Sequence, residues 1–109
     1  MLYLRDRAGF SARLKQIFES HQLSVESMAE WLCLDVQAIE AAMEGDPTLP
    51  VIVAVVREFA VDPTWLITGD YNASTLRSAI DDPVRAVSEV LRRTEPRAFD
   101  VGSDSQASL

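Results

Sequence analysis

Apolar residues in the first half of the chain recur at the three- and four-residue spacing that brings side chains onto one face of an α-helix. The first such stripe consists of Phe10, Leu14, Ile17 and Phe18. The second consists of Met28, Ala29 and Leu32, and the third of Ala38, Ile39, Ala42 and Met43. Ser24 and Asp35, which precede the second and third stripes, are residue types that cap helices well, and Gly45 is typical of a helix end. The pattern therefore predicts three helices, with a tight turn between the second and the third.

Prolines mark the starts of the later helices, because proline lacks an N–H and the first turn of a helix does not need one. Pro50, Pro63 and Pro83 each stand at such a start, and the aspartate directly before the last two adds a capping residue. The run after Pro50 is rich in β-branched residues but keeps helical spacing, so it is interpreted as a helix and not as a strand. The last helix carries a narrow apolar stripe of Val84, Val87, Val90 and Leu91.

These elements predict an all-α fold in three parts. Residues 1–70 form a five-helix domain, residues 71–94 form a C-terminal helical extension, and residues 95–109 form a disordered tail of polar composition. The extension is expected to begin with a short helix over residues 74–80. The whole chain has 109 residues, and nearly half of them are apolar, which is enough for one compact core.

Several residues also stand at the spacing of a known family. They are Leu23, Ser24, Ala29, Glu30, Leu32, Ile39 and Gly45. The segment 61–70, with the sequence VDPTWLITGD, is similar to a closing pattern V-S-P-D-W-L-L-T-G-E. Over about residues 10–70 the chain thus resembles the lambda-repressor and Cro-like helix-turn-helix family. The resemblance implies a five-helix repressor-like domain and a bacterial or phage transcription regulator, and a generic small helical bundle is the alternative fold.

In this family the third helix lies in the major groove, and its first residues reach the base edges. A glutamine there pairs with adenine, and a valine contacts the methyl group of thymine. Arg13 and Lys15 match positions near the start of the first helix that reach the DNA backbone, although a solvated helix face also explains them. The DNA-binding residues that the resemblance implies are Arg13, Lys15, Val36, Gln37, Glu40 and Ala41.

The charges of the chain argue in the opposite direction. The formal net charge is −7, and no lysine or arginine occurs between Lys15 and Arg57. Duplex DNA is a row of phosphates that proteins bind largely through basic side chains. An alternative function follows, in which the helix-turn-helix fold is kept, DNA binding is lost, and an acidic surface binds a basic patch on another protein. That surface lies around Glu40, Glu44 and Asp46.

Three further features leave the mode of interaction open. The stripe formed by Val84, Val87, Val90 and Leu91 either folds back onto the domain or pairs with its twin in a homodimer. Trp31 either anchors a protein partner or packs against a neighbouring helix. Arg5 and Arg7 either form a basic arm or belong to a frayed terminus.

Cys33 stands in the predicted turn, where the family usually has glycine. If the backbone there is left-handed, a side chain costs on the order of 1 kcal/mol. The thiol is expected to be half-buried in the core.

With one cysteine and one histidine, the chain offers no set of residues that could act as nucleophile and base or bind a metal ion. Neither an enzyme nor a metal or cofactor site is therefore expected. The longest apolar run, residues 51–56, is too short to cross a membrane, and a cytoplasmic location is expected.

Overall fold

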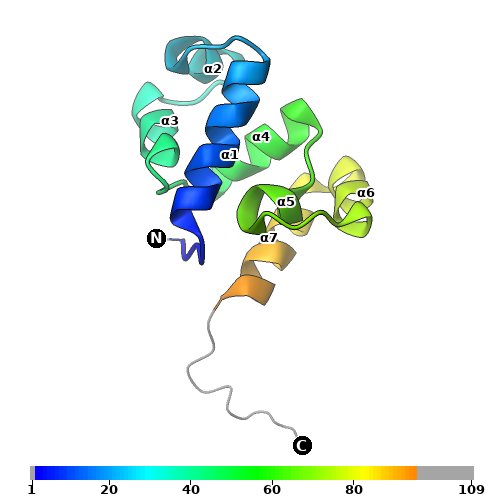
Figure 1. Ribbon diagram of the computed structural model, residues 1–109. Coiled ribbons are helices and arrows are strands. Elements are labelled where there is room, and N and C mark those ends of the chain that lie inside the picture. The colour runs from blue at the N-terminus through cyan, green and yellow to red at the C-terminus, as the bar shows by residue number, and fades with distance from the viewer. Residues whose placement is uncertain (1, 96–109) are drawn as a thin grey trace, which may run out of the picture.

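The computed structural model of the protein describes residues 2–95 and consists there of seven α-helices without a strand (Figure 1). The helices are α1 (Arg7–Ser20), α2 (Val25–Leu32), α3 (Val36–Met43), α4 (Leu49–Phe59), α5 (Pro63–Thr68), α6 (Ala73–Asp81) and α7 (Pro83–Thr94). The all-α class predicted from the sequence is confirmed, and the β-branched run after Pro50 is helical. Of the predicted tail, residues 96–109 lie outside the described residues.

Capping side chains explain where several helices begin. Ser24 caps α2 and Asp62 caps α5, each through a side-chain oxygen that accepts a backbone N–H. α1 begins before its apolar stripe, because Asp6 accepts a hydrogen bond from the N–H of Gly9 at 2.9 Å. Asp35 precedes α3 as predicted, but its carboxylate makes no capping hydrogen bond. Helix starts therefore follow from local capping chemistry at most of these positions.

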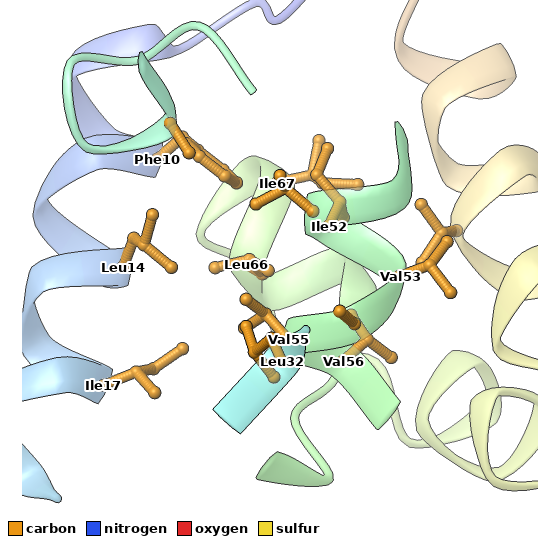
Figure 2. Packing of buried hydrophobic residues seen from close by; sticks show 14 of the residues in the cluster. Phe10, Leu14, Ile17, Leu32, Ile52, Val53, Val55, Val56, Leu66 and Ile67 are labelled. Atoms are coloured by element: carbon orange, nitrogen blue, oxygen red, sulfur yellow. The ribbon is translucent and has the colours of Figure 1, made fainter. Parts of the chain in front are cut away.

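α4 is the centre of the molecule. All six of its residues 51–56 are buried, and a helix that is apolar all round has to be covered all round. Phe10 and Leu14 of α1 approach the shared core from one side, while Val53 points toward α7 on the other side (Figure 2). α7 provides this second cover through its own buried residues, which are Ala86, Val87 and Val90.

The apolar stripe on α7 thus folds back onto the domain, which is one of the two alternatives that the sequence left open. Val87 and Val90 are 0% and 3% exposed, so neither is available to a second chain while α7 is docked. Leu91 is half-buried, and Val84 is 52% exposed. Of the four residues predicted for dimerisation, Val84 alone presents a largely exposed side chain.

A buried carboxylate ties α5 to α6. Asp62 is 3% exposed, and its Oδ1 accepts hydrogen bonds from the N–H of Thr64 at 3.0 Å and from the hydroxyl of Thr75. Its Oδ2 accepts one from the N–H of Asn72, the residue that caps α6. A buried carboxylate is stable only when hydrogen bonds satisfy its oxygens. Asp62 therefore requires donors from the C-terminal extension, and the two segments share one buried network.

Replacing Val87 with aspartate tests whether α7 belongs to the core. A carboxyl group at a fully buried site costs at least about 4 kcal/mol through desolvation or protonation, so Val87→Asp should leave the chain largely unfolded. Val84→Asp is the matched control at an exposed site, and it should change the free energy of unfolding by less than about 1 kcal/mol. Urea denaturation of dilute protein, followed by circular dichroism, measures both. Equal stability of the two variants would contradict the docking of α7.

Candidate nucleic-acid interface

The second and third helices meet at a left-handed turn. Cys33 ends α2 with φ 58° and ψ 45°, and the N–H of Leu34 donates to the carbonyl of Ala29 at 2.9 Å. The backbone is the left-handed one in which glycine avoids a strain of on the order of 1 kcal/mol. The thiol of Cys33 is exposed, so the expectation that it is half-buried in the core is wrong. The neighbouring Leu32 fills the core at this point instead.

The outward face of α3 contains the residues predicted to read bases. Gln37 and Glu40 are exposed, and Val36 and Ala41 lie half-buried beside them. The buried residues of α3 are Ile39 and Ala42, which pack into the core. The structure therefore brings the four α3 residues together on one side of the helix, where they are accessible to a ligand.

Exposed acids are frequent in and around α3 and in the helices before it. They are Glu19, Glu26, Glu30, Asp35, Glu40, Glu44 and Asp46. Among residues 2–95, Asp46 alone of these forms an ion pair, with Arg7 at 3.5 Å. Each acid that lies about 10 Å from a phosphate repels it by roughly 0.4 kcal/mol in water before screening. Several such repulsions together offset much of what a phosphate contact contributes.

Arg13, one of the two cations predicted to contact DNA, is occupied within the chain. Its Nε donates to the carbonyl of Leu66 at 2.9 Å, and its Nη2 donates to the carbonyl of Ile67 at 3.2 Å. Its Nη1 lies 3.7 Å from Asp6, and only 13% of the side chain is exposed. The last carbonyls of a helix have no partner inside that helix, so Arg13 satisfies the end of α5. This contact by itself accounts for an arginine at the position.

Two further side chains of α1 bind the end of α3 in the same way. The hydroxyl of Ser11 donates to the carbonyl of Met43, and Nη1 of Arg7 donates to the carbonyl of Gly45 at 2.7 Å. Gly45 has φ 90°, and a Cβ there would lie 3.0 Å from the carbonyl oxygen of Arg7, which explains the glycine. Arg7 also donates to the carbonyl of Leu2 at 3.1 Å. Arg7 is thus held against the protein and does not extend as an arm.

Lys15 and Arg5 are exposed cations in and before α1, and the side chain of Arg7 also stays 41% exposed. Neither Lys15 nor Arg5 belongs to an ion pair in the part of the chain that the structure describes. Helical spacing was enough to predict that Lys15 is exposed. No local signal predicts the partner of Arg13, because Leu66 follows it by 53 residues.

Trp31 packs against a neighbouring helix and is still half exposed. Its ring meets the ring of Phe59 edge-on, with centroids 5.3 Å apart, and 49% of the residue is exposed. His21 packs on the same Phe59 ring at a centroid distance of 4.6 Å. Aromatic pairs in this geometry contribute about 0.5–1.5 kcal/mol beyond the area that they bury. The cluster therefore fastens the ends of α1 and α2 to α4.

Among residues 2–95, no group of three or more His, Cys, Asp and Glu side chains is arranged to hold a metal ion. None of the described helices is long and apolar enough to cross a membrane.

Comparisons with protein-family models, with curated proteins and with solved structures found no match to this chain. Function is therefore inferred from the geometry and the charge of the chain itself.

Removal of the Arg13 side chain should destabilise the fold. Arg13→Ala loses two charge-assisted hydrogen bonds and leaves two carbonyls without their partner, so it should cost about 2–4 kcal/mol of unfolding free energy. Lys15→Ala, at an exposed position on the same helix, is the matched control and should cost less than about 0.5 kcal/mol. Urea denaturation measures both variants. If Arg13→Ala were as stable as the wild type, the contacts with α5 would not exist in solution.

Proposed function

We propose that the protein is a transcription regulator of the helix-turn-helix type that binds a specific DNA sequence through α3. The observation that carries this proposal is the exposure of the first turns of α3, where Gln37 and Glu40 face solvent. Anchoring of α3 by Ser11 and Arg7 supports it, because a helix that reads bases has to be held in a fixed orientation. A regulator of this kind acts in the cytoplasm of a bacterial cell.

The side chains of α3 limit which bases it reads. Gln37 suits adenine, with which an amide forms a bidentate pair, and Glu40 suits cytosine, whose amino group donates to a carboxylate. Val36 and Ala41 suit the methyl group of thymine. Arginine and lysine, the usual partners of guanine, are absent from α2 and α3. The preferred site should therefore be read mainly at adenine, thymine and cytosine edges.

Few cations remain to hold the DNA backbone. Because Arg7 and Arg13 donate to carbonyls of the chain, Lys15 is the exposed cation among those that match the family. Each phosphate contact contributes about 0.9 to the slope of log K against log salt, so two copies that each use Lys15 give a slope of about 2. Proteins that make 6–10 such contacts have slopes several times steeper. This protein should therefore bind at low salt and mostly through base contacts.

Selection of duplexes from a random library at low salt, followed by a salt titration of the enriched sequence, tests the proposal. We expect a slope of about 2. Gln37→Ala should reduce the preference for the enriched sequence by about 10- to 100-fold and leave the slope unchanged, whereas Lys15→Ala should lower the slope. Gln16→Ala, an exposed glutamine on α1, is the control and should change neither quantity. Failure to enrich any sequence would exclude DNA reading by α3.

A second candidate function is a protein-interaction module that keeps the fold without binding DNA. It is favoured by the absence of lysine and arginine from α2 and α3 and by the orientation of Arg13, which points at carbonyls of α5. The cation that pairs with an acid of the acidic surface is Arg7, next to Asp46. A surface of one sign attracts a partner of the opposite sign and steers it toward contact. The partner in this case is a protein with a basic patch, docked on Glu40, Glu44 and Asp46.

Charge reversal on α3 separates the two functions, because it has opposite effects on them. Glu40→Lys should abolish capture of a basic partner protein, whereas it should strengthen DNA binding by replacing a repulsion with an attraction. Gln37→Ala is the matched control on the same face and should leave protein capture intact. Affinity capture from a lysate and mobility shift at low salt measure the two activities. Capture that survives Glu40→Lys would exclude the acidic surface as the docking site.

A further inference from the structure

A hollow of about 350 Å³ opens on the surface where α4 meets α7 and the turn between α2 and α3. Leu32 and Leu34 line it from the side of the turn, and Val84 lines it from α7. Val53 and Arg57 are among the residues of α4 that line it, and every described lining residue other than Arg57 is apolar. Small-molecule sites are concave, occupy roughly 300–1,000 Å³ and combine apolar walls with few polar groups. The hollow has the size and the lining of such a site.

Arg57 gives the hollow one polar group that can hold a ligand. Its Nε lies 3.3 Å from a carboxylate oxygen of Glu58, and the two side chains are 54% and 35% exposed. Residues adjacent on a helix do not face each other, and exposed ion pairs hold weakly. A guanidinium has five N–H donors, and within residues 2–95 neither Nη atom of Arg57 donates to a protein oxygen. The edge formed by the two Nη atoms can therefore bind an oxyanion while Nε stays with Glu58.

We propose that this hollow binds a small apolar molecule that carries one carboxylate. The hydrocarbon part lies against Val53 and Val84, and the carboxylate accepts hydrogen bonds from both Nη atoms of Arg57. This two-bond geometry is the one that arginine and carboxylate groups favour. Because Arg57 is the one cation that lines the hollow, the ligand carries a single negative charge. A second charge would face Glu58 and a chain of net charge −7 without a partner.

This ligand site goes beyond the proposed function and does not depend on it. None of the residues proposed to contact DNA lines the hollow, so α3 stays accessible when the ligand is bound. The walls come from separate segments of the chain, and they come together only when α7 is docked on α4. A ligand that binds the folded chain alone stabilises it against unfolding. Ligand binding can therefore be measured, and lost, without any DNA.

NMR titration of the isotope-labelled full chain with octanoate tests the proposal, with octanol as the uncharged probe of the same chain length. Octanoate should shift the amide signals of Leu34, Val53 and Val84 in a saturable way and bind at least about tenfold more tightly than octanol. Arg57→Gln should abolish this difference, because it removes the cation. Arg77→Gln is the matched control and should change neither affinity, since Arg77 is an exposed arginine of α6 that does not line the hollow.

A substitution in the wall tests the position of the ligand. Arg57 also lines a second hollow of about 300 Å³, which Ile80 lines and Val84 does not. Val84→Asp should weaken octanoate binding at least about tenfold through like-charge repulsion, whereas Ile80→Asp is the matched control and should leave it unchanged. Circular dichroism verifies that these exposed variants are folded. Octanoate that saturates no signal, equal affinity for octanol, or a loss of binding in Ile80→Asp alone would each overturn the proposal.

Discussion

The burial of α4 on every side is the constraint on which the rest of the structure depends. Its residues 51–56 are apolar, and full burial contributes on the order of 1.5–3 kcal/mol for each valine or isoleucine side chain. One layer of helices cannot cover a helix all round. α2 and α3 contact α4 on one side, and α6 and α7 contact it on another (Figure 1). The C-terminal helices therefore complete the core that supports α2 and α3.

Around this core, polar side chains of α1 hold the ends of two other helices. Ser11 donates to the carbonyl of Met43, the last residue of α3, and Arg7 donates to that of Gly45 just beyond it. Arg13 donates to the last carbonyls of α5. A helix end that is partly buried needs such donors, because unpaired carbonyls cost free energy. A guanidinium carries five N–H donors, so these bonds do not by themselves exclude a phosphate, but they fix where the two arginines point. Arg7 thus helps to orient α3, and Arg13 fastens α1 to α5.

Helix positions could be predicted from apolar spacing and capping residues, because both depend on residues that are close in the sequence. The partner of Arg13 could not, since a contact across 53 residues has no spacing rule. The burial of Val87 within its own chain could not be predicted either. An apolar stripe has the same sequence pattern whether its own chain or a second chain covers it. The sequence left open whether the backbone at Cys33 is left-handed, as it is in the structure, and the exposure of its thiol depends on packing around the turn.

Cys33 also makes the turn between α2 and α3 a natural position for a spectroscopic label. It is the single cysteine of the chain, and its thiol lies at the surface. A maleimide dye or a nitroxide would therefore attach once per molecule, next to the helix whose ligand is sought. Because the N–H of Leu34 and the carbonyl of Ala29 hold the turn in place, the label would move with the helix pair as one body. Its signal would report docking on α3, by nucleic acid or by protein, without any engineered residue.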